Sequence, residues 1–154
     1  MQIDFDPSVI SYGDLLEVFW NAHNPIYGEA YGQYRSMILY QNEEQRRQAE
    51  DSMARKERLL GAHFTTTIAP LKNFTPAEFY HQKFYLQADQ VLIKEILSRY
   101  PNRKAIIDST AAARLNGYAA GYGDRESLEK EIDRLGLTDE GTAYLMKSLE
   151  TPDS

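Results

Sequence analysis

The chain has 154 residues, of which 42% are hydrophobic and 26% charged, and its 17 basic and 23 acidic residues give a net charge of −6. This composition predicts one globular domain with an appendage, in the cytoplasm, because neither an apolar run of about 18 residues nor a signal-peptide layout is present. The acidic balance argues against nucleic acid and anionic membrane as partners, and the absence of cysteine removes disulfides, thiolate metal ligands and cysteine nucleophiles from these residues.

The first half of the chain alternates between strand and helix patterns. Ser11 and Asp14 form a predicted capping box, and Asn42 and Gly61 predict the two ends of a long polar helix. Runs of alternating or β-branched residues predict the strands. The expected elements are strands at 2–6, 34–40 and 63–69, and helices that run from Ser11 to about residue 22 and from 43 to about 60. This order predicts an α+β or α/β sandwich.

The second half has helical patterns only. Thr75 and Glu78, with Pro76 between them, predict a helix start. Beyond residue 87, apolar spacing predicts an all-helical tail broken by Pro101 and several glycines. Its expected helices lie at about 88–100, 109–119, 125–135 and 139–149.

General motifs for cofactors and metals are missing from the sequence. The three histidines, His23, His63 and His81, have no metal-ligand spacing, so we predict no metal site and interpret each as a packed or surface residue. No glycine-rich phosphate loop occurs. Tyr34, where a polar loop enters the strand at 34–40, is a candidate to hold an oxygen because its phenol donates a hydrogen bond and keeps its proton at neutral pH.

A series of short motifs in fixed order carries more information than any one of them. They are Phe5-Asp6-Pro7, Ile10-Ser11-Tyr12, Leu15-Leu16, Val18-Phe19-Trp20, His23-Asn24-Pro25, Gln33-Tyr34-Arg35-Ser36, Asn42-Glu43-Glu44-Gln45 and Ala77-Glu78-Phe79-Tyr80-His81-Gln82. Over residues 1–87 this series resembles the A-type peptide methionine sulfoxide reductases. The resemblance implies a ferredoxin-like mixed sheet with flanking helices, truncated at its N-terminal strand, and a helical extension at 88–154.

The resemblance also implies a reaction and a set of site residues. The family reduces methionine-S-sulfoxide in oxidised proteins, using a cysteine thiolate and then thioredoxin or another dithiol, without a cofactor. On that pattern Tyr34 bonds the sulfoxide oxygen and Glu29 takes the place of a pocket aspartate. His81 belongs to a short helix beside the pocket, where Phe84 and Tyr85 complete the expected substrate-binding residues.

The family's nucleophile lies in a Gly-Cys-Phe-Trp motif that we expect upstream of Met1. Without a thiol this chain is expected to be inactive alone. Three interpretations stay open: a shortened reductase, a non-catalytic module that binds the sulfoxide, and a fragment completed by another chain. The lost segment would leave a sheet edge uncovered, and the helical tail would pack on that edge or outside the sandwich. Free and protein-bound methionine sulfoxide are equally open as ligands.

Overall fold

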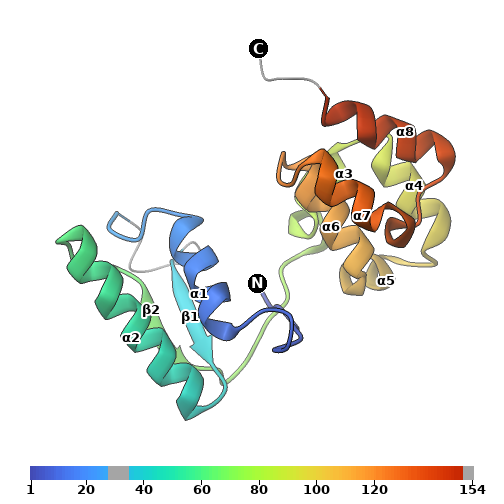
Figure 1. Ribbon diagram of the computed structural model, residues 1–154. Helices are drawn as coiled ribbons and strands as arrows, with labels where there is room; N and C mark the ends of the chain where they lie inside the picture. Colours follow the sequence, from blue (N-terminus) through green and yellow to red (C-terminus); the bar gives the residue numbers. More distant parts are fainter. Residues whose placement is uncertain (28–34, 151–154) are drawn as a thin grey trace. The chain divides into compact units, whose positions relative to one another are not determined.

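A computed structural model describes residues 1–27 and 35–150 of the chain, which forms two compact units, 1–76 and 77–154 (Figure 1). The elements of the first unit are α1 (Tyr12–Asn21), β1 (Met37–Tyr40), α2 (Glu43–Leu60) and β2 (Thr67–Pro70). Those of the second are the 3-10 helix η1 (Phe79–His81), α3 (Phe84–Ala88), α4 (Leu92–Arg99), α5 (Arg103–Asp108), α6 (Thr110–Ala119), α7 (Arg125–Leu135) and α8 (Asp139–Ser148).

This organisation confirms the predicted fold class, a mixed α/β region followed by helices. The predicted domain boundary after residue 87 came from the resemblance, whereas the compact units meet at 76/77; the boundary stays a prediction about the family domain. No helix in the described part of the chain is long and apolar enough to cross a membrane.

Local side-chain bonds fix the helix ends in the first unit as predicted. The Ser11 hydroxyl accepts a bond from the Asp14 backbone N–H, and the Asp14 carboxylate accepts one from the Ser11 N–H. Asn42 caps α2 through the backbone N–H of Gln45. Gly61 ends α2 with a φ of 64°, a left-handed conformation that glycine adopts without steric cost.

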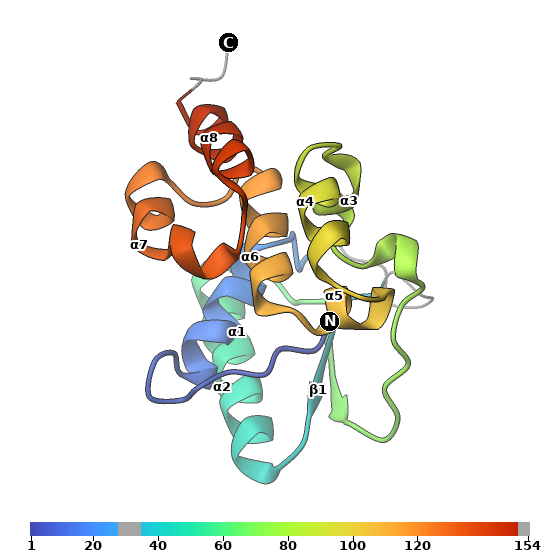
Figure 2. The same cartoon turned by 90° about the vertical axis from the view of Figure 1, so that its right-hand side faces the viewer.

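The described strands form a parallel two-stranded sheet, with Ile38 opposite Ile68. Helix α2 connects β1 to β2, and α1 and α2 lie side by side against the sheet (Figure 2). Ile38 packs with three buried residues of these helices, Leu16, Trp20 and Ala49. Leu39, which points to the opposite face, keeps 38% of its surface exposed. The core of the first unit therefore lies on one face of its sheet.

The predicted strand at 2–6 is wrong. This segment contains no strand, and its backbone turns at Asp6 instead, where the Ser8 N–H and hydroxyl both donate to the Asp6 carboxylate. The backbone N–H groups of Val9 and Ile10 bond the Asp6 carbonyl. Local bonds to an aspartate side chain thus prevail over a weak alternating pattern that has no partner strand among the described residues.

Two further element boundaries differ from the prediction. The strand expected at 63–69 begins only at Thr67, because the backbone N–H of Phe64 bonds the Glu57 carboxylate and that of Thr65 bonds the Pro25 carbonyl. The helix start expected at Thr75 is also wrong, and helical structure begins instead at η1 and resumes in α3. Residues 75–78 are exposed and non-helical, and without an apolar face to bury, their capping pattern does not produce a helix.

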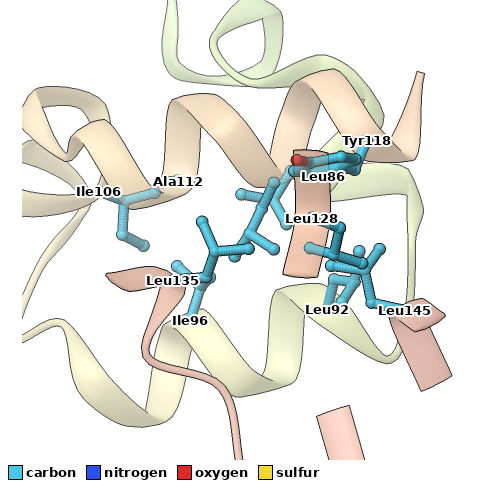
Figure 3. Packing of buried hydrophobic residues seen from close by; sticks show 10 residues of the cluster. Leu86, Leu92, Ile96, Ile106, Ala112, Tyr118, Leu128, Leu135 and Leu145 are labelled. Carbon is cyan, nitrogen blue, oxygen red and sulfur yellow. The ribbon is translucent and has the colours of Figure 1, made fainter. Parts of the chain in front are cut away.

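The second unit encloses its own hydrophobic core (Figure 3). Helix α6 contacts α3, α5 and α7, and its Leu115 is fully buried. The other core residues come from all the α-helices of the unit: Leu86, Leu92, Ile96, Ile106, Ala112, Tyr118, Leu128, Leu135 and Leu145. The four helices predicted in the tail are confirmed within a few residues. Helix α5 was missed because its single turn and a half, capped by Asn102, is too short for a periodic pattern.

Candidate functional site

The predicted site residues fall into two groups. Glu29 and Tyr34 lie outside the described residues. His81, Phe84 and Tyr85 lie on η1 and α3, and together with Tyr80 they form an exposed cluster that we call the aromatic surface. Tyr80, Phe84 and Tyr85 keep 63%, 59% and 51% of their surfaces exposed. The rings of Tyr80 and His81 lie 4.2 Å apart, and Phe84 and Tyr85 meet edge to face at 5.5 Å between centroids.

The backbone around Lys83 places these rings in solvent. Lys83 has a φ of 50°, the single positive value among the described non-glycine residues, and it separates η1 from α3. The Gln87 amide donates to the carbonyls of Phe79 and Gln82 and so holds this tight connection. Because α3 turns Leu86 into the core, the preceding two rings project outward. Strain of this kind is common where side chains are held for binding.

Charge near the aromatic surface is modest. Partial burial lowers the pKa of the Lys83 ammonium, and the Asp108 carboxylate acts in the opposite direction. The guanidinium of Arg103 lies 4.6 Å from the centre of the Phe79 ring, a cation–π contact. The surface therefore combines exposed π faces with a few donors, an arrangement suited to an apolar ligand that carries one polar oxygen.

In the first unit, Ser36 lies close to Tyr34 in the sequence, and its hydroxyl is hydrogen-bonded to other side chains. Its hydroxyl lies 2.8 Å from His23 Nε2 and 2.9 Å from the Thr66 hydroxyl. His23 Nδ1 is 2.9 Å from the Phe19 carbonyl, and the two rings meet edge to face. Thr66 is buried, whereas His23 and Ser36 are half-buried. This polar network joins α1, β1 and the approach to β2.

Sequence reasoning did not connect these three residues. It treated His23 as an ordinary packed or surface histidine and Ser36 as part of a motif centred on Tyr34. The available indication of this network in the sequence was that three separate segments each carry a polar residue next to an apolar run. Their contacts span 13 and 30 residues of sequence, so spacing within one element could not reveal them.

A cavity of about 350 Å³ lies elsewhere in the second unit, lined by Glu95, Ser98, Arg99, Gly136, Leu137 and Thr138. His81, Phe84 and Tyr85, the predicted site residues in the described part of the chain, do not line it. The Glu95 carboxylate accepts bonds from the Thr138 N–H and hydroxyl at 3.0 and 2.8 Å, and the Arg99 guanidinium bonds the Gly136 carbonyl. Its charged groups are thus engaged in joining α4 to the α7–α8 turn, and we assign the cavity a structural role.

The Glu95 contact predicts a pH-dependent contribution to stability. The bonds from Thr138 lower the pKa of Glu95. Since the folded pKa lies below the unfolded value of about 4.3, the contribution is complete above that pH and is lost as the pH falls through the lowered pKa. We expect Glu95→Gln to destabilise the protein at neutral pH by about 0.5–1 kcal/mol, a figure at the low end because the site is accessible to water.

Thermal unfolding at neutral pH and near pH 2.5 tests this expectation, since the two proteins should converge in acid. Glu78→Gln is the matched control, because Glu78 is an exposed carboxylate of the same unit whose side chain makes no hydrogen bond in the described structure. A deficit of Glu95→Gln that persists unchanged in acid would contradict the assigned role.

The fold and the aromatic surface define a mixed α/β protein with a helical C-terminal region and an exposed surface of apolar and hydrogen-bonding groups. A family model described as peptide methionine sulfoxide reductase matches residues 1–114, and one described as the helical domain of selenoprotein methionine sulfoxide reductase A matches residues 102–144. The chain belongs to the peptide methionine sulfoxide reductase family.

Curated relatives carry the same name. A peptide methionine sulfoxide reductase of Drosophila melanogaster is 41% identical over 97% of this chain and 61% of its own length. The MsrA of Sulfolobus acidocaldarius is 41% identical over 70% of this chain and 59% of its own length, and that of Saccharolobus solfataricus is 43% identical over 55% and 51%. The chain therefore spans between about half and three-fifths of the length of these relatives.

Proposed function

We propose that this chain is the sulfoxide-binding part of an A-type methionine sulfoxide reductase, which recognises methionine-S-sulfoxide in oxidised polypeptides and does not reduce it unaided. The observation that carries the proposal is the family match over residues 1–114, a range that contains every predicted site residue. Tyr34 would donate to the sulfoxide oxygen, and Glu29 would line the same pocket. His81, Phe84 and Tyr85 would contact the substrate.

The aromatic surface supports a role in substrate contact. Methionine sulfoxide is an apolar chain interrupted by one strongly accepting oxygen. Exposed rings offer flat apolar area to the chain, while the Tyr85 hydroxyl and the His81 ring supply polar groups beside it. Exposed aromatic residues grouped in this way are characteristic of binding surfaces on soluble proteins.

The cysteine content supports the proposal that the chain does not reduce the sulfoxide unaided. Reduction of a sulfoxide by the family route requires a thiolate that attacks sulfur, and the 154 residues contain none. Thioredoxin or a small dithiol would serve as reductant only where a cysteine is supplied. A fragment completed by another chain would meet that condition, whereas a non-catalytic binding module would not. A place in cytoplasmic repair of oxidised proteins is part of the proposal.

Titration of the ¹⁵N-labelled chain with three matched peptides tests the binding role. The peptides contain methionine-S-sulfoxide, methionine-R-sulfoxide or methionine at one position. We expect the S-sulfoxide peptide to bind most tightly and to shift the resonances of Tyr34 and His81 most. Tyr34→Phe removes one hydroxyl and should weaken S-sulfoxide binding about fivefold, the equivalent of one hydrogen bond. Equal responses to all three peptides would refute the proposed ligand.

A further inference from the structure

The hydrogen bonds around Ser36 have one consistent direction. The Phe19 carbonyl can only accept, so His23 Nδ1 carries the proton of that 2.9 Å bond. In the neutral ring Nε2 is then an acceptor, and the Ser36 hydroxyl donates to it. The Ser36 oxygen in turn accepts from Thr66. One carbonyl thus orients a chain of three side chains, and bonds in such a chain strengthen one another.

Hydrogen bonds to the backbone carbonyls of Pro25 and Ser36 lie next to this chain of side chains. The Thr65 N–H and hydroxyl both donate to the Pro25 carbonyl, at 3.0 and 3.2 Å, and the Thr67 N–H donates to the Ser36 carbonyl at 3.1 Å. Pro25 and Ser36 are therefore tied to the same short stretch, 65–67. These bonds fix the positions of Pro25 and Ser36 relative to residues 65–67.

We infer that His23, Ser36 and Thr66 are positioning residues for sulfoxide binding: their hydrogen-bonded chain fixes the backbone at Ser36, where the chain enters β1, and thereby the affinity for the sulfoxide. This inference rests on the proposed function. None of the three residues needs to touch the ligand. A positioning group of this kind acts because a binding geometry must be held to within about 0.5 Å to be effective.

Removing the central hydroxyl should have the largest effect. Ser36→Ala leaves His23 Nε2 without a donor and the buried Thr66 hydroxyl without its acceptor. We expect the dissociation constant for the methionine-S-sulfoxide peptide to rise about tenfold, and that for the methionine peptide to change less than about twofold. Thr66→Val has nearly the same shape and removes only the donor to Ser36, so we expect a rise of about threefold.

The controls separate positioning from general damage. Thr67→Val makes the same exchange at the neighbouring exposed residue, whose side chain makes no hydrogen bond in the described structure, and should leave binding unchanged. Thr66→Ser keeps the hydroxyl and should restore wild-type affinity. The ¹⁵N shifts of the His23 ring provide a spectroscopic readout. They should report a proton held on Nδ1 in the wild type and a mixture of tautomers in Ser36→Ala.

The possible outcomes are distinct. A wild-type chain that does not distinguish sulfoxide from methionine overturns the proposed function and this inference with it. A selective wild type whose Ser36→Ala and Thr66→Val variants bind with unchanged affinity overturns the inference alone. If Ser36→Ala does not fold, Thr66→Val against Thr66→Ser decides: equal affinity of these two variants refutes a positioning role, and a threefold difference supports it.

Discussion

Incubated with a methionine-S-sulfoxide peptide and a dithiol, the 154-residue chain is expected to produce no methionine above the blank. The reason is chemical: by the family route a protein thiolate takes up the sulfoxide oxygen as a sulfenic acid, which a second thiol then reduces, and neither tyrosine nor histidine can take the place of that thiolate. Separation of the peptide and its reduced product by chromatography measures the outcome directly.

Two controls make this result informative. The Drosophila melanogaster relative, assayed in parallel, serves as the positive control. Addition of the part of that relative outside the aligned region, supplied as a separate polypeptide, tests completion by another chain, since a polypeptide that supplied the missing thiol would restore turnover. Measurable reduction by the 154-residue chain alone would disprove the mechanistic argument, because no residue in it can form the required sulfur intermediate.

Leu115→Ala is expected to cost about 2–5 kcal/mol of unfolding free energy, because Leu115 is fully buried at the centre of the second unit and its loss leaves a cavity. The single tryptophan, Trp20, lies in the core of the first unit. In urea unfolding, tryptophan fluorescence therefore reports on the first unit, whereas circular dichroism reports on the helices of both units. We expect the dichroism transition to shift and the fluorescence midpoint to stay in place.

Two further variants complete this test, one at an exposed position of the second unit and one in the core of the first unit. Leu97→Ala, at a position that is 56% exposed on the neighbouring helix α4, should change stability by less than about 0.5 kcal/mol. Ser52→Ala should act on the first unit instead, since it leaves the buried indole N–H of Trp20 without the acceptor it has at 3.0 Å, at a cost of about 1–3 kcal/mol. Identical shifts of both probes in every variant would show that the units unfold as one.

The sequence predictions were accurate where they depended on interactions between residues that are close in sequence. Ser11, Asn42 and Gly61 were assigned to helix ends correctly because each cap depends on backbone groups three or four residues away. Thr75 has the same local pattern and does not cap a helix, because nothing packs against the exposed residues that follow it. Capping residues mark a helix end only where packing stabilises the helix itself.

The candidate site was predictable in part for the same reason. His81, Phe84 and Tyr85 are close in sequence, so a short helical segment was enough to group them, and the structure shows their exposure. The link from Ser36 to His23 and Thr66 joins three segments, and only the fold brings these together. The family was recognisable from the sequence because the order of its motifs does not depend on knowing the three-dimensional structure.

By itself, the sequence determined the family, the succession of helices, most of their ends, and the absence of a thiol. These properties depend on residue identity and on contacts within about four residues along the chain. The tertiary structure decided that the alternating pattern at residues 2–6 does not form a strand, where the sheet begins, and how a serine, a histidine and a threonine share one hydrogen-bonded chain. Such choices depend on partners that folding brings from distant segments, and a local pattern does not specify them.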